Sequence, residues 1–157
     1  MKFLFAFILF TCIAGHAQDF NPGGVTIQML EQKKHPQDTS APAAYLYKTG
    51  KSYFEYTGMQ WRVVTDVAYR IKIYSKAGYD YANEKITHNK YGKCIFYDAA
   101  TYNIGENGIE KTPLDTTTII TQSINKIFET RSMAMPNVKE GSIIEYKPVV
   151  HLGNIDF

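Results

Sequence analysis

Cysteine is scarce in this sequence, and its scarcity excludes a fold held together by disulfide bonds. The 157 residues include two cysteines, Cys12 and Cys94. Cys12 lies in an apolar N-terminal stretch that we expect to be removed on export, so the mature chain would keep Cys94 alone. Stability must then come from packing. A domain of this length can bury roughly two-thirds of the surface that its unfolded chain exposes.

An excess of charge of one sign is also lacking. The sequence has 17 basic and 15 acidic residues, which gives a net charge of +2. The two signs are interleaved along most of the chain. Proteins that bind nucleic acids gather Lys and Arg on one face to contact phosphates. We therefore expect no nucleic-acid partner.

The sequence lacks an apolar run long enough to cross a membrane as a helix, which needs roughly 20 residues. Its longest run, Phe3–Ile13, follows Lys2 and precedes the small-x-small site Gly15-His16-Ala17. A short apolar core between a positive end and such a site is typical of a secretory signal peptide. We predict that residues 1–17 are a signal peptide and that the mature chain begins at Gln18.

Export places the mature protein in the periplasm, at the cell surface or outside the cell, with no membrane span after cleavage. A lipid anchor on Cys12 is the alternative. Phe10-Thr11 is a poor approach to a lipidation site, and the apolar core continues beyond Cys12, so cleavage is the favoured interpretation.

Sustained helical periodicity is absent, and alternation takes its place. The run Trp61–Ser75 places apolar and charged side chains on alternate positions, as in a strand with one buried face. We expect a long strand with a bulge or bend near Val64–Thr65, where the alternation blurs. The predicted buried face carries Trp61, Val63, Val67, Tyr69, Ile71 and Ile73, and the predicted solvent face carries Arg62, Asp66, Arg70 and Lys72.

The rest of the chain predicts an antiparallel β-sandwich of immunoglobulin-like architecture. Prolines and turn formers in residues 18–42 leave an extended N-terminal arm with at most one helical turn. Residues 43–157 then form the sandwich domain, because short β-rich runs alternate there with turn signals. The turns include a hairpin at Thr49–Ser52 and one at Asn107-Gly108. A further strand is predicted over Tyr79–His88.

A thiol enzyme would use Cys94 as the nucleophile, with His88 or His151 as the base and Asp98 to orient it. Cys94 lies in an apolar strand without a nearby turn or helix start that would lower its pKa, and a cysteine in this setting is more often a small core residue. We expect no catalytic residues in this chain.

Metal ligands are not predicted either. His35, His88 and His151 have no partner at the short spacing that places two ligands on one face. Asp80, Glu84 and Asp115 do not form a calcium loop. We expect no metal and no cofactor.

Aromatic residues are plentiful, and they raise the question of a binding face. Most should lie in the core, because alternate residues of a strand face inward. Exposed aromatics on a sandwich could instead stack on sugars or contact a partner. Tyr79, Tyr81 and Trp61 are the candidates for such a face.

A resemblance to a known family rests on four stretches of the sequence, which are Tyr69–Ile73, Gly78–Ala82, Ala99–Asn103 and Met135–Tyr146. The chain resembles a β-sandwich domain of unknown function found at the N-terminus of exported bacterial proteins, ahead of a transglutaminase-like domain of papain-type fold. The likeness covers most of Ala43–Val150. Its last stretch is the most specific, and it carries Glu145, which would need a partner if buried.

The resemblance implies that the catalytic Cys, His and Asp of such proteins lie in the domain that follows. This chain ends at Phe157, so none of those residues can be assigned here, and we expect the sandwich to be truncated at its C-terminal end. The implied function is a non-catalytic accessory or interaction module whose partner is a C-terminal transglutaminase-like domain. The alternative is a stand-alone cell-envelope domain that binds a glycan or a peptide.

Overall fold

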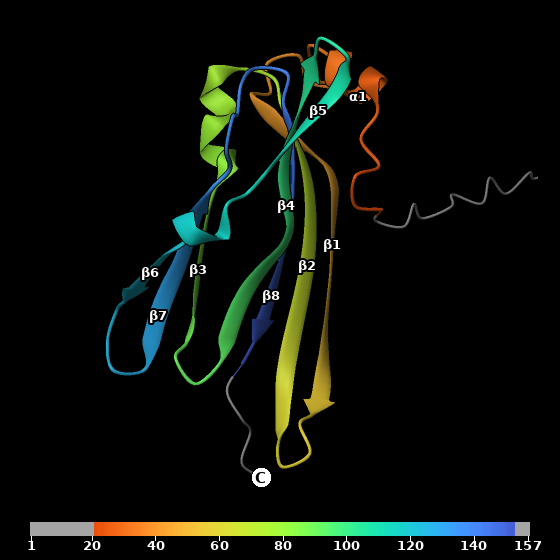
Figure 1. The fold of residues 1–157 in the computed structure, drawn as a ribbon. Helices are drawn as coiled ribbons and strands as arrows, with labels where there is room; N and C mark the ends of the chain where they lie inside the picture. Colours follow the sequence, from red (N-terminus) through yellow and green to blue (C-terminus); the bar gives the residue numbers. More distant parts are fainter. Residues whose placement is uncertain (1–20, 153–157) are drawn as a thin grey trace, which may run out of the picture.

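A computed structural model describes residues 21–152 as two packed antiparallel sheets (Figure 1). The predictions for the signal peptide and for Cys12 lie outside these residues. One sheet has the order β1-β2-β8-β4-β5 and the other the order β3-β7-β6. The predicted all-β sandwich is therefore confirmed. The strands are β1 (Ala43–Tyr56), β2 (Trp61–Ile73), β3 (Asn83–Asn89), β4 (Lys93–Gly105), β5 (Gly108–Pro113), β6 (Ile120–Ser123), β7 (Phe128–Ala134) and β8 (Ile143–His151).

The long hairpin of β1 and β2 differs from the prediction in where it turns. A turn at Thr49–Ser52 is wrong, because β1 runs through these residues and Gly50 pairs with Val67 of β2. The chain reverses instead at Thr57–Gln60, where Thr57 N–H donates to the Gln60 carbonyl and Gly58 adopts φ +91°. A glycine can lie in an extended strand as well as in a turn, so Gly50 alone was a weak turn signal.

The bend expected at Val64–Thr65 is also wrong. β2 pairs with β8 in one register from Val64 to Lys72. The bulges lie in its neighbours, between Tyr45 and Tyr47 of β1 and between Tyr97 and Ala100 of β4. Asp98 sits in the second bulge with φ 51°, the left-handed conformation that such bulges use.

A 3₁₀ helix, η1 (Lys76–Ala82), replaces the first part of the strand predicted over Tyr79–His88. Gly78 explains its position, because a Cβ there would lie 2.4 Å from the carbonyl oxygen of Pro42. The backbone thus packs against the start of β1 at a distance that only glycine permits. β3 begins after η1.

The main core lies between the two sheets. It is built from the odd-numbered face of β2, as predicted for Ile71 and Ile73, together with residues of β4, β7 and β8. Its buried members are Ile71, Ile73, Ala82, Cys94, Phe96, Leu114, Met133, Met135, Ile144 and Tyr146.

A second core lies on the other face of the five-stranded sheet, where the N-terminal arm covers it. The predicted helical turn is present as α1 (Ile27–Glu31), whose N-cap Thr26 accepts from the Met29 N–H through its hydroxyl. Leu30 of α1 is 1% exposed. The arm is thus part of the packed structure. The buried members of this core are Val25, Leu30, Ala100, Tyr102 and Ile143.

The arm overturns the prediction that the even-numbered face of β2 is exposed to solvent. Arg70 is 9% exposed and Lys72 is 0% exposed. Alternation identified the two faces of the strand, but sequence alone could not show that a distant segment covers the charged face. Trp61, which was assigned to the buried face, is exposed because it lies at the turn end of the hairpin.

Lys72 is held by main-chain oxygens. Its Nζ donates to the carbonyls of Leu30 and Gly141, each at 2.6 Å. Burial lowers the pKa of Lys72 to about 8, and the nearby charge of Lys33 acts in the same direction. A neutral amine still has two N–H groups, so both hydrogen bonds survive deprotonation.

We predict that the contribution of Lys72 to stability rises with pH between about 8 and the unfolded value of about 10.4. In this window the unfolded state binds more protons than the folded state, so folding becomes more favourable as pH rises. The measurement is the difference in free energy of unfolding between wild type and Lys72→Met, obtained by urea denaturation at several pH values. The difference should shift towards wild type by at most about 1.4 kcal/mol per pH unit.

The raised pKa of Cys94 makes its contribution to stability fall as pH rises in this range. Cys94 is present in both proteins, so this contribution cancels in the difference between them. A difference that stays constant between neutral pH and about pH 10 would show that Lys72 keeps an ordinary pKa in the folded protein.

Candidate functional site

A buried ion pair fastens the arm to the sheet. Arg70 Nε lies 2.5 Å from Glu145 Oε1, and Glu145 is fully buried. The second carboxylate oxygen of Glu145 accepts from the Gly23 N–H at 2.8 Å, and Arg70 Nη2 donates to the Asn21 carbonyl at 2.7 Å. Burial, followed by the charge of Glu145, raises the pKa of Tyr102. Glu145 therefore has the partners that its burial requires.

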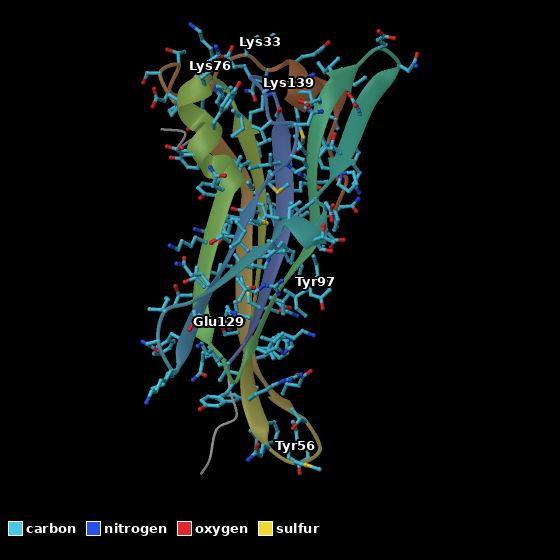
Figure 2. The ribbon with its side chains drawn as sticks, turned by 60° about the vertical axis from the view of Figure 1, so that its left-hand side comes forward. Lys33, Tyr56, Lys76, Tyr97, Glu129 and Lys139 are labelled. Atoms are coloured by element: carbon cyan, nitrogen blue, oxygen red, sulfur yellow. The ribbon has the colours of Figure 1, made fainter. Side chains whose placement is uncertain are left out.

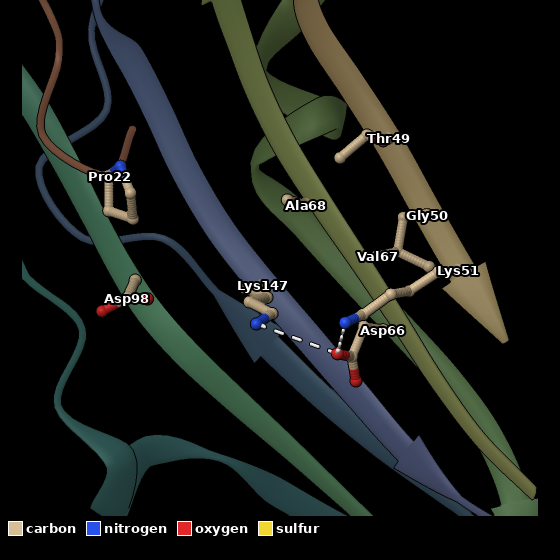
Figure 3. A pocket seen from close by; sticks show the side chains of 9 residues that line it. All are labelled: Pro22, Thr49, Gly50, Lys51, Asp66, Val67, Ala68, Asp98 and Lys147. Carbon is tan, nitrogen blue, oxygen red and sulfur yellow. Dashed lines mark ion pairs between the residues drawn. The ribbon is translucent and has the colours of Figure 1, made fainter. Parts of the chain in front are cut away.

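Beside the arm, the same sheet face contains a hollow of about 480 Å³ (Figure 3). Pro22 of the arm and Asp98 of the bulge in β4 bound it on one side, and Thr49, Gly50 and Lys51 of β1 bound it on the other. Small residues form its floor, which is why the surface is recessed there. The residues that line it are Pro22, Thr49, Gly50, Lys51, Asp66, Val67, Ala68, Asp98 and Lys147.

Charges of both signs face this hollow. Asp66 Oδ2 lies 3.9 Å from the ammonium groups of both Lys51 and Lys147, and Asp66 is 8% exposed (Figure 3). Asp98, on the bulge, is exposed. Among the nine lining residues there is no Ser, Cys or His. The hollow can thus receive a ligand that carries both an amine and a carboxylate, such as a peptide end.

The three predicted aromatic binding residues do not form one face. Tyr81 of η1 contacts Tyr45, with ring centroids 6.1 Å apart, and Trp61 contacts Tyr56 at 5.2 Å. Tyr79 packs against the main core. Figure 1 places η1 and the β1–β2 turn at opposite ends of the sandwich, so Trp61 is separated from the other two.

Eight of the 17 exposed large hydrophobic residues among residues 21–152 lie instead in turns or at strand ends towards one end of the sandwich. The β1–β2, β3–β4 and β6–β7 turns lie towards the end of the sandwich at which β8 finishes (Figure 1). The Lys90 N–H donates to the Ile127 carbonyl at 2.8 Å, which joins the β3–β4 turn to the β6–β7 turn. The Leu152 N–H donates to the Val63 carbonyl at 2.9 Å, which joins the end of β8 to β2. We call the following exposed residues the apolar end: Tyr56, Met59, Trp61, Tyr91, Ile124, Ile127, Phe128 and Leu152.

The opposite end is charged. Figure 2 shows Lys33, Lys76 and Lys139 there, while Tyr56 marks the apolar end. The sequence concealed this contrast, because residues of the apolar end come from four separate segments. What they have in common is an apolar residue in a turn or at a strand end, where polar residues are the rule.

Cys94 and its candidate partners lie in different surroundings. Cys94 is 0% exposed in the main core, where burial raises the pKa of its thiol to about 11. His88 lies beside Glu129, His151 lies beside Glu55, and Asp98 faces the hollow. Within residues 21–152, no group of three or more His, Cys, Asp and Glu residues could hold a metal ion.

We predict that Cys94 resists alkylation in the folded protein. A thiol that is fully buried and carries a raised pKa presents little thiolate to a reagent. Mass spectrometry after iodoacetamide treatment at pH 8 should find Cys94 unmodified without urea and modified with it. Rapid modification of the native protein would mean that the thiol is accessible and activated.

We predict that Arg70→Met costs about 3–5 kcal/mol of unfolding free energy, because it leaves the Glu145 carboxylate buried without its partner. The matched control is Arg62→Met. Arg62 pairs with Glu55 near the surface, where such pairs contribute about 0–1 kcal/mol. Chemical denaturation measures both, and equal losses would contradict the assignment of Arg70 as the attachment point of the arm.

Among residues 21–152, no helix is both long and apolar enough to span a membrane. No protein-family model and no curated protein match the sequence. The fold does resemble the solved structure of a candidate protease from Parabacteroides distasonis ATCC 8503, with a TM-score of 0.58 and 8% sequence identity. The likeness covers 73% of this chain and 24% of that chain. It establishes a shared fold over about a quarter of the Parabacteroides protein.

Proposed function

We propose that this chain is a non-catalytic β-sandwich module of a larger exported protein, in which it docks a transglutaminase-like or peptidase domain. The observation that carries the proposal is the apolar end. Exposed apolar residues on a soluble protein mark a surface that another protein covers when they are contiguous. Here such residues belong to four turns and strand ends that lie towards the same end of the sandwich.

The position of the apolar end supports docking within one polypeptide. β8 finishes there, and Leu152 is itself exposed at 43%. Any domain that followed β8 in sequence would start beside this surface, and a short connection keeps the local concentration of such a domain high.

The likeness to the Parabacteroides chain supports the same conclusion. The shared fold makes up 24% of that chain, so a sandwich of this kind occurs there as one part of a longer protein. The resemblance of the Met135–Tyr146 stretch to domains that precede a papain-type fold suggests the class of the neighbouring domain. Catalysis would then belong to that neighbour.

The hollow beside the arm favours a second candidate function, which is the binding of a peptide by the module itself. Lys51 and Lys147 would face a carboxylate, and Asp98 would face an amine. This candidate needs no neighbouring domain, and it predicts binding by this chain alone.

The test starts with the coding sequence on both sides of this segment. We expect the same reading frame to encode a papain-type domain with Cys, His and Asp. That domain and this chain, produced separately, should bind one another in isothermal titration calorimetry. The double variant Met59→Ser/Trp61→Ser should weaken binding at least about tenfold, because buried aromatic contacts dominate interface energies.

The control is Ile104→Ser/Ile109→Ser, which alters two similarly exposed apolar residues at the opposite end. It should leave the affinity within about twofold, since residues outside an interface contribute little to binding. A reading frame without such a domain, or equal affinities for the two double variants, would refute the proposal.

A further inference from the structure

The outer edge of β1 is a long open strand edge. β1 has 14 residues and ends the five-stranded sheet, and no described strand pairs with its free side. Proteins usually protect such edges with short strands, prolines or bulges. From Lys48 to Tyr56, β1 contains no proline, and its register with β2 is unbroken. The protection expected for an edge of this length is therefore missing here.

Lysine is another common protection of edges, but the two lysines of this segment lie back over their own sheet. Lys48 Nζ sits 5.2 Å from the ring centroid of Tyr45 and 5.4 Å from that of Tyr69. Lys51 Nζ sits 5.0 Å from the Tyr53 ring and 3.9 Å from Asp66. Neither ammonium group needs to be displaced before another strand can approach.

The hydrogen bond at the turn shows which residues of β1 direct their backbone groups away from β2. The Thr57 N–H donates to the Gln60 carbonyl at 3.0 Å, which makes this a hydrogen-bonded pair. Such pairs alternate along an antiparallel ladder, so odd-numbered residues of β1 bond to β2. The even-numbered residues direct their N–H and C=O groups outward, and they are Lys48, Gly50, Ser52, Phe54 and Tyr56.

Residues 50–56 are complementary to themselves when two copies run antiparallel about a two-fold axis at Tyr53. Lys51 then faces the partner's Glu55, and the same pair recurs on the other side of the axis. Cross-strand Cβ atoms lie about 4.5–5.5 Å apart, which suits pairs of opposite charge.

The other face of this pairing is also complementary. Gly50 faces the partner's Tyr56, an arrangement in which an aromatic ring covers a glycine on a strand edge. Ser52 faces the partner's Phe54, which is 64% exposed in the single chain. In this register every outward-facing residue from Gly50 to Tyr56 meets another outward-facing residue, so the backbone groups of both strands are satisfied.

We propose that Gly50–Tyr56 of β1 pairs antiparallel with the same residues of a second copy of this chain, joining two five-stranded sheets into one continuous sheet. A second copy is the occupant because the register that matches both Lys51–Glu55 pairs requires the same sequence on each side. The proposed interface shares Gly50 and Lys51 with the lining of the hollow and Tyr56 with the apolar end. It does not depend on the proposed docking of another domain.

The experiment is sedimentation velocity of the purified chain over a wide range of concentration. Wild type should dimerise, and Ser52→Pro should raise the dissociation constant at least tenfold, equivalent to about 1.4 kcal/mol. Proline removes an outward N–H and leaves the bonds to β2 intact. The control Ser52→Ala loses the hydroxyl contact with Thr65 but keeps the N–H, so it should dimerise like wild type.

Charge exchange tests the register. Lys51→Glu and Glu55→Lys should each be monomeric, because like charges then face one another twice. An equimolar mixture of the two variants should form a heterodimer, since opposite charges face one another again at both positions. Circular dichroism checks that each variant is folded.

A wild-type chain that stays monomeric at the highest concentration would overturn the proposal. So would folded Ser52→Pro protein that dimerises as tightly as wild type, which would locate the contact elsewhere, for example at the apolar end. Failure of the mixture to associate, when wild type does, would overturn the register and with it the argument for a second copy.

Discussion

The structure depends on charges buried on what would otherwise be the solvent face of its main sheet. Arg70, Lys72 and Glu145 lie beneath the N-terminal arm, and each binds main-chain atoms of the arm. Removing a charge from water costs several kcal/mol unless hydrogen bonds replace the lost hydration. The arm supplies these hydrogen bonds together with apolar contacts from Leu30. The five-stranded sheet is thus covered on both faces where the arm lies.

The position of the arm on the sheet determines where the hollow and the apolar end lie. Pro22 lies near the start of the described part of the arm, and the hollow lies beside it because Gly50 and Ala68 leave no bulk on the sheet. Farther along, the β1–β2 hairpin extends past the arm to the apolar end (Figure 1). The part of the five-stranded sheet that the arm covers can hold the rest of the sheet in position, which is what an interaction module requires of its fold.

Strand content, the sandwich and the helical turn of the arm were predictable because each depends on local pattern. The prediction that odd-numbered residues of β2 are buried was correct at Ile71 and Ile73, where the alternation reflects the main core. Prediction failed where distant residues decide. Arg70 and Lys72 look like solvated charges in sequence, and only the arm, far away along the chain, makes them buried. The apolar end was missed for the same reason. The candidates Trp61 and Tyr81 are both aromatic, but they lie in different parts of the structure.

The contact between Gly23 and Glu145 has a consequence for the order in which the protein can form. These residues are 122 positions apart, so the first described segment cannot reach its final place until almost the last strand has been synthesised. Contacts of such separation slow folding because a large loop must close before they form. Translation alone therefore cannot complete this fold progressively from its N-terminus. The arm can dock only after β8 has been made, so its attachment through Gly23 and Glu145 is a late step in the formation of the fold.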